Sequence, residues 1–235
     1  MKIIRALWGG NRIGEIRNEI PLKPQHDEVV YVWGTENFEY LISLGYDTRY
    51  MADSKTTEYS EESEYALKLE ALDLAYQEFK EFLFLDWDCI NTKSIDGLEF
   101  NSPSMPLYSY PKDFIFPNTT LQPNTTLQKQ LALYSWEFED TYVIPNASCI
   151  SVQGFNLGKE LKSIHAEHNF NTLIEEFAFK VFTNCTLDEY IQNYDSPYLY
   201  GRESSQYFLV GGNKVNTAKK LNKYIGRKNI RFIHE

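Results

Sequence analysis

The first half of the chain alternates predicted strands with predicted helices, and this order of elements constrains the fold more than any other feature. Residues 3–7, 28–34 and 47–53 have strand-like patterns, whereas 36–44 and 61–81 have helical spacing of their apolar residues. Strands that alternate with helices form a mostly parallel sheet covered by helices. We therefore expect an α/β fold with a mostly parallel central sheet flanked by helices. A chain of 235 residues can bury one sizeable core, so we expect a single domain.

The helix predicted at 61–81 has one apolar face, formed by Tyr65, Leu69, Leu72, Tyr76 and Phe79. In the second half, residues 141–154 predict a pair of strands, and Asn156 is placed to cap a helix that runs to about residue 167. Thr172 and Glu175 have the spacing of a capping box, so we expect a further helix to open there.

Two other segments of the second half have distinctive sequences. Residues 117–128 contain the six-residue unit PNTTLQ twice in tandem, which is too few copies for a solenoid and is interpreted as an extended loop. Near the end, Asn216 is placed to cap a basic helix that stops at Gly226, and residues 229–234 predict a last strand.

An acidic pair lies directly after the most apolar predicted strand. Residues 82–85 (FLFL) run straight into Asp86, Trp87 and Asp88. A charge at the end of a buried strand is unfavourable unless it is paired, so we expect a partner for it. Parallel α/β sheets bind ligands beyond the carboxyl ends of their strands. Two carboxylates at that position suit a hard divalent cation that also holds a diphosphate.

Two classes of enzyme place an Asp-x-Asp motif after an apolar strand. Haloacid-dehalogenase-like phosphatases have Asp-x-Asp-x-Thr/Val on their first strand, whereas this chain has Ile90 at the fifth position and carries the motif on its fourth predicted strand. A phosphatase or a nucleotidyltransferase that uses the same aspartates remains an alternative. A sugar-nucleotide-binding protein without turnover is another.

The second class is the GT-A nucleotide-sugar glycosyltransferases, which the chain resembles more closely. The resemblance rests on the central Asp86-Trp87-Asp88, on the acidic pair Glu175-Glu176 about 90 residues later, and on His234 after a short terminal strand. The segments IIRALWGG and YVWGTENFEYLISLGYDTRYM look most like small glycosyltransferases of phages and large DNA viruses.

The resemblance implies a metal-dependent hexosyltransferase that uses Mn²⁺ or Mg²⁺. Asp88 would bind the metal directly, Asp86 would contact the ribose or support the metal, and His234 would complete the metal site. Glu176 would deprotonate the acceptor hydroxyl. Glu175 lies at the capping-box position, which gives it a structural role.

The same resemblance implies a nucleotide pocket at the strand ends. Trp8, Gly9 and Trp33 would stack on or approach the nucleobase, and Asp53 would accept a hydrogen bond from the base or the ribose. Lys219, in the basic C-terminal segment, would face the diphosphate.

By position, residues 1–100 would bind the nucleotide sugar and residues 101–235 the acceptor. The expected donor is a UDP-sugar, and the acceptor is a hydroxyl group, with modified DNA bases and glycans as candidates. The net charge of −10 argues against general affinity for nucleic acid or for anionic membranes. Three cysteines without metal-binding spacing favour a reducing compartment, so we expect a cytoplasmic protein, in the host cytoplasm if the protein is viral.

Overall fold

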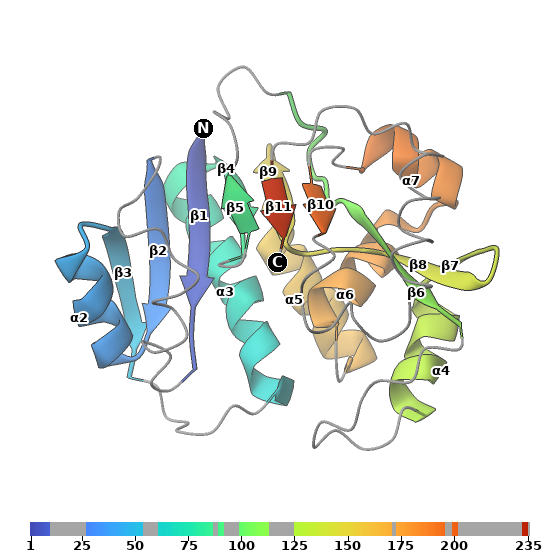
Figure 1. The fold of residues 1–235 in the computed structure, drawn as a ribbon, viewed down its shortest axis with the longest axis horizontal. Helices are drawn as coiled ribbons and strands as arrows, with labels where there is room; N and C mark the ends of the chain where they lie inside the picture. The colour runs from blue at the N-terminus through green and yellow to red at the C-terminus, as the bar shows by residue number, and fades with distance from the viewer. Residues whose placement is uncertain are drawn as a thin grey trace.

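The described part of the chain forms three sheets, with helices packed on the central one (Figure 1). The computed structural model describes residues 1–9, 27–53, 61–86, 89–91, 99–112, 125–170, 173–195, 199–201 and 232–234. The strands are β1 (Lys2–Leu7), β2 (Glu28–Trp33), β3 (Asp47–Ala52), β4 (Glu81–Leu85), β5 (Cys89–Asn91), β6 (Leu107–Pro111), β7 (Trp136–Phe138), β8 (Thr141–Pro145), β9 (Cys149–Gln153), β10 (Leu199–Gly201) and β11 (Phe232–His234). The helices are α2 (Thr35–Ser43), α3 (Glu61–Phe79), α4 (Thr125–Tyr134), α5 (Leu157–His168), α6 (Ile174–Thr183) and α7 (Leu187–Asn193).

The central sheet has the strand order β3-β2-β1-β4-β9. β1, β2, β3 and β4 are all parallel, and only β9 runs antiparallel, beside β4. The predicted α/β architecture with a mostly parallel sheet is therefore confirmed. The strands and helices predicted in the first half are present, and Gly45 has the positive φ of 86° expected just past a helix end.

Alternating side chains of the central sheet enter different parts of the core. Ile4 and Ala6 of β1 belong to the main apolar cluster, which includes buried residues of α3, α5 and α6. Leu7 instead packs with Leu41 of α2, which lies on the other face. Helices thus cover both faces of the sheet, as expected for parallel strands.

Close packing of α3 and α5 is set by a glycine and a cap. Asn156 caps α5 as predicted, since its side chain accepts a hydrogen bond from the Lys159 N–H at 3.1 Å. Its amide also donates to Asp73 of α3 at 2.6 Å. A Cβ atom on Gly158 would lie 2.3 Å from the Asp73 backbone nitrogen, so the two helices are as close here as a glycine allows.

Two predictions for the second half are wrong. β8 and β9 are both strands but do not form a pair: β8 lies between β6 and β7 in the small antiparallel sheet, whereas β9 joins β4. The chain changes sheets because β9, with Ile150 and Val152 buried, completes the core beside β4. The second PNTTLQ unit does not remain a loop, because α4 begins at Thr125. Residues 117–124 and the predicted helix at 216–226 lie outside the described residues.

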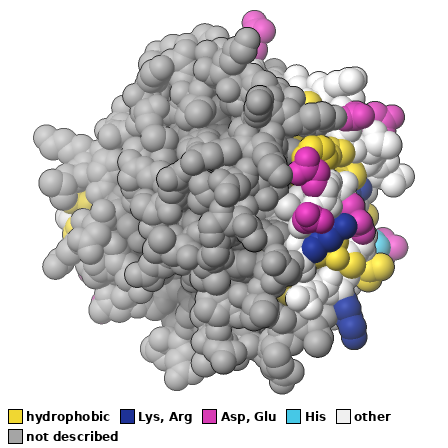
Figure 2. Space-filling model, turned by 45° about the vertical axis from the view of Figure 1, so that its right-hand side comes forward, with side chains coloured by type: hydrophobic (Ala, Val, Ile, Leu, Met, Phe, Trp, Pro, Cys, Tyr) yellow, Lys and Arg dark blue, Asp and Glu magenta, His cyan; other side chains and the backbone are white. Residues whose placement is uncertain are grey.

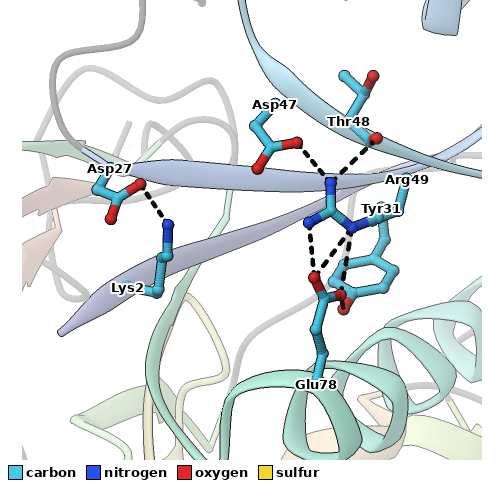
Figure 3. Close-up of polar contacts among 7 residues, drawn as sticks. All are labelled: Lys2, Asp27, Tyr31, Asp47, Thr48, Arg49 and Glu78. Carbon is cyan, nitrogen blue, oxygen red and sulfur yellow. Dashed lines mark hydrogen bonds and ion pairs between the residues drawn. The ribbon is translucent and has the colours of Figure 1, made fainter.

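The outer strand β3 carries a charged network (Figure 3). The guanidinium of Arg49 binds Glu78 of α3 through two nitrogens and also contacts Asp47. Glu78 accepts a hydrogen bond from the Tyr31 hydroxyl at 2.9 Å, and burial together with this bond raises the pKa of Tyr31. Charges of this kind protect an edge strand from pairing with another chain.

In the strip of described surface visible in Figure 2, acidic, basic and apolar side chains lie beside one another. None of the helices in the described part of the chain combines the length and apolar composition of a membrane span.

Candidate functional site

The carboxyl ends of four neighbouring parallel strands meet at one edge of the central sheet. β3, β2, β1 and β4 lie side by side in this order, so the residues that follow them form a row. The row contains Asp53 after β3, Trp33 at the end of β2, Trp8 and Gly9 after β1, and Asp86 after β4. The fold therefore brings the first aspartate of the motif to the same edge as the predicted nucleotide pocket.

Asp86 has the partner that its position demands. Its Oδ1 lies 2.8 Å from the ammonium nitrogen of Lys68 in α3. The alternation along β4 explains this orientation, because Phe82 and Phe84 face the main cluster beneath α3 and Asp86 follows with the same period.

Lys68 also binds a second carboxylate, so it connects three elements of the fold. The Lys68 ammonium lies 3.1 Å from Glu175 of α6, and the two side chains are only 6% and 1% exposed. Burial disfavours the ammonium form, but the charges of Asp86 and Glu175 outweigh it and raise the pKa of Lys68. Lys68 is therefore charged, and α3, β4 and α6 meet at one buried cation.

The predicted capping box at the start of α6 is wrong. The helix begins at Ile174, and the N-cap residue is Leu173, with a φ of 48° and no side-chain capping bond. Glu175 is thus the second residue of the helix and points into the interior, where burial raises its pKa. The ion pair with Lys68 explains why a glutamate lies in this buried position.

Glu176 differs from its neighbour in both exposure and partners. Its side chain is partly exposed, and its Oε1 accepts a hydrogen bond from the Ala147 N–H at 3.3 Å. Burial and the adjacent charge of Glu175 raise the pKa of Glu176 to about 8. A carboxyl group with this pKa can exchange protons near neutral pH, which suits a general base.

The motif is followed by a strand that contacts the C-terminal end of the chain. The Cys89 N–H donates to the Asp86 carbonyl at 3.0 Å, and β5 then begins. β5 pairs antiparallel with β11, so that the backbone of His234 lies opposite Cys89 (Figure 1). The backbone of His234 therefore lies opposite the residue that follows Asp88 in the sequence.

Some of the predicted site residues are not among the described residues. Trp87, Asp88 and Lys219 lie outside the described residues, and only the backbone of His234 is described. Among the described residues there is no cluster of three or more His, Cys, Asp or Glu side chains suited to a metal ion.

Trp8, Gly9 and Trp33, which are predicted to bind the nucleotide, lie at the ends of β1 and β2, where hydrogen bonds join the two strand ends. Gly9 has a φ of 91°, and its carbonyl accepts a hydrogen bond from the buried Asn37 amide at 3.1 Å. The same amide donates to the Trp33 carbonyl at 3.3 Å, so it joins the two strand ends. Trp33 packs in the main cluster with 7% exposure, whereas Trp8 is partly exposed. The indole nitrogen of Trp8 is buried without an acceptor among the described residues.

Asp53, at the far end of this row, is exposed and held by two hydroxyl groups. Thr35 donates to its Oδ1 at 2.5 Å, and Tyr50 donates to the same oxygen. These two hydrogen bonds lower the pKa of Asp53, the one from Thr35 most strongly. The carboxylate is therefore ionised and oriented before any ligand binds.

Lys68 is the site residue that the sequence analysis missed. Its position was a usable signal, because it lies three residues after Tyr65 and four before Leu72, on the predicted apolar face of the helix. A lysine on a buried face requires a buried carboxylate. The buried Asn37 was also missed, and no sequence pattern indicates it.

Comparisons with known proteins address the fold. No protein-family model matches the sequence, and no curated protein sequence is significantly similar to it. Among solved structures, the apo form of the bifunctional glycosyltransferase WbbM matches with a TM-score of 0.50 and 16% identity, over 100% of this chain and 45% of that one. The galactosyltransferase LgtC, in complex with donor and acceptor sugar analogues, matches with a TM-score of 0.50 and 10% identity, over 100% of this chain and 86% of that one.

A glycosyltransferase involved in glycosylation of the major capsid of PBCV-1 matches with a TM-score of 0.43 and 15% identity, over 99% of this chain and 92% of that one. The TM-scores of WbbM and LgtC are high enough to show the fold. At these sequence identities, the two structures show the fold alone. The chain has the α/β fold of these glycosyltransferases, which confirms the predicted GT-A-like fold.

Proposed function

We propose that this protein is a glycosyltransferase that moves a sugar from a nucleotide diphosphate sugar to a hydroxyl acceptor. The observation that carries the proposal is the cluster at the end of β4, where Lys68 holds Asp86 and Glu175 together beside Glu176. The cluster lies at the edge where parallel sheets bind ligands, in a fold shared with known glycosyltransferases.

The donor would bind along the row of strand ends. Asp53 is ionised and oriented by Thr35 and Tyr50, so it would accept hydrogen bonds from the base or ribose. Trp8 would contact the base, because it is partly exposed and its indole N–H has no acceptor among the described residues. Gly9 would allow a close approach of the nucleotide to the backbone. Trp33 would support the base-binding surface from the core side, since little of its side chain is accessible.

A divalent cation fits the chemistry of the motif. Carboxylate oxygens are the ligands that Mn²⁺ and Mg²⁺ prefer, and neutral imidazole is a ligand for manganese-like ions. Because Lys68 already neutralises Asp86, we assign direct ligation to Asp88 and His234 and a supporting or ribose-binding role to Asp86. When bound, the cation would stabilise the charge of the leaving diphosphate. Lys219 is proposed to add a positive charge there.

Glu176 would take the proton from the acceptor hydroxyl. Its pKa of about 8 places its ionisation near neutral pH, and its partial exposure lets an acceptor reach it. Residues 1–100 would then hold the donor and residues 101–235 the acceptor. Lys68 of the first part contacts Glu175 of the second.

The finer assignments rest on the sequence resemblance. We propose a UDP-sugar as donor, a glycan or a modified DNA base as acceptor, and a viral protein that acts in the cytoplasm. The net charge of −10 favours a glycan over DNA.

A donor screen tests this function. The protein is incubated with a panel of UDP- and GDP-sugars with Mn²⁺ or with EDTA, and free nucleotide diphosphate is measured. We expect release with at least one donor, dependent on the metal and abolished by Asp88→Asn. A sugar-nucleotide-binding protein would gain thermal stability with a donor and release nothing. A phosphatase would hydrolyse simple phosphate monoesters. If no donor gives either release of nucleotide diphosphate or a thermal shift, the proposal is refuted.

A further inference from the structure

A buried arginine occupies the middle of the central strand β1. Arg5 is 4% exposed, and its neighbours in the strand, Ile4 and Ala6, are buried apolar residues. Its Nε lies 3.2 Å from Glu28 of β2, and the two side chains are 5% and 3% exposed. Replacing a buried ion pair of this kind by apolar residues of similar volume is often neutral or stabilising, so stability alone does not explain why it is here.

The other end of the guanidinium holds the backbone around the Asp-x-Asp motif. Nη1 of Arg5 donates to the Asp86 carbonyl at 2.6 Å and to the Cys89 carbonyl at 3.2 Å. These carbonyls belong to the residues immediately before and after Trp87-Asp88. A single nitrogen therefore binds the chain on both sides of the proposed metal ligand.

Glu28 fixes the orientation of the guanidinium that donates these two hydrogen bonds. The Nε bond to Glu28 holds one edge of the planar guanidinium, and the rigid fork then places Nη1 at a fixed position. A lysine in the same place carries one ammonium group without this planar geometry, so a bond to Glu28 would not fix the direction of its remaining donors.

We propose that Arg5 is a positioning residue that fixes the backbone of Asp86 and Cys89, the described residues on either side of Trp87-Asp88, and thereby supports binding of the metal and the donor. The inference rests on the proposed function and extends it to a residue that contacts neither ligand. The effect also reaches the C-terminal strand, because Cys89 lies opposite His234 in the β5–β11 pair. Loss of Arg5 would make the backbone beside both proposed metal ligands, Asp88 and His234, less rigid.

The test compares two paired substitutions. Arg5→Met with Glu28→Met removes both the hydrogen bonds to the Asp86 and Cys89 carbonyls and the buried carboxylate that pairs with Arg5. Arg49→Met with Glu78→Met is the matched control, because it removes another Arg–Glu pair, which joins the outer strand β3 to α3. Backbone amide exchange at Cys89 and Mn²⁺ affinity, measured by paramagnetic resonance of the free ion, are determined for both proteins and for the wild type.

We expect the Arg5 pair to raise the exchange rate at Cys89 and to weaken Mn²⁺ binding, each about tenfold, as expected for the loss of one or two hydrogen bonds. The control should leave both unchanged. Unchanged Cys89 exchange, or faster exchange with wild-type Mn²⁺ affinity, would overturn the inference. If the wild type itself binds no Mn²⁺, the metal-dependent function fails, and Cys89 exchange alone then decides whether Arg5 holds this segment.

Discussion

Substitution of Lys68 by methionine gives the sharpest test of the buried cluster. Methionine retains most of the side-chain volume but removes the positive charge that pairs with both Asp86 and Glu175. Glu175 is 1% exposed, so its carboxylate would remain in the core without its ion pair. Removing one partner of a buried pair destabilises proteins by about 3–5 kcal/mol, and we expect Lys68→Met to fall in this range at pH 7.

The destabilisation should depend on pH in a defined direction. Burial raises the folded-state pKa of Glu175 above its ordinary value of 4.5, and loss of Lys68 raises this pKa further. A group with a raised pKa contributes stability below its unfolded pKa and loses it as the pH rises through the folded pKa. The difference between wild type and Lys68→Met should therefore be smallest below the ordinary pKa of glutamate and should grow towards neutral pH.

Equilibrium unfolding in urea at several pH values measures these differences. Lys162→Met is the matched control, because Lys162 binds Asp73 with 46% of its side chain exposed and its loss should change stability by less than about 1 kcal/mol. Adding Glu175→Gln to Lys68→Met should restore part of the stability at pH 7. A loss no larger than that of Lys162→Met, or a loss independent of pH, would show that the ion pairs do not hold these elements together.

Three further predictions concern the site and its support. Glu176→Gln should lower the rate of sugar transfer to the acceptor far more than it lowers donor affinity measured by calorimetry. The wild-type transfer rate should rise with pH through about pH 8, where Glu176 ionises, and this rise should be lost in the variant. Equal losses in transfer and affinity would place Glu176 in the donor pocket instead. Asp88→Asn should abolish metal-dependent turnover while stability in metal-free buffer stays equal or rises slightly, and normal turnover with Mn²⁺ would remove Asp88 from the metal site. Gly158→Ala should destabilise the protein by about 1–3 kcal/mol in urea unfolding, because its Cβ would lie 2.3 Å from the Asp73 backbone nitrogen; a neutral result would mean that α5 shifts freely on α3.

The sequence predicted the central sheet because each element there has a local signal. Strand patterns, Gly45 after α2 and Asn156 before α5 are all properties of neighbouring residues, and the structure agrees with each. The pairing of β8 and β9 was predicted wrongly because proximity in sequence favours a hairpin. Burial of β9 beside β4, a contact between distant parts of the chain, decides the outcome instead.

The site was predictable to the extent that it depends on strand ends. The position of Asp86 followed from the apolar run before it, and its need for a partner followed from the free energy of burying a charge. The identity of that partner was not predicted: the place of Lys68 on the apolar face of its helix indicates a buried cation, but the carboxylates that it binds are set by contacts between separate elements. Glu175 was given a capping role on local spacing, but its contact with Lys68 is formed only in the folded chain.

The adjacent residues Glu175 and Glu176 lie in different environments, so one has a structural role and the other is available for the proposed proton transfer. Glu175 lies in the interior, where Lys68 keeps its charge paired, and this fixes the first turn of α6 against β4. Its negative charge, added to burial, raises the pKa of Glu176 to about 8. A neutral residue at position 175 would therefore lower the pKa of Glu176 as well as loosen its position. If Glu176 is the general base that we propose, the buried Glu175 would influence proton transfer through the pKa of its neighbour.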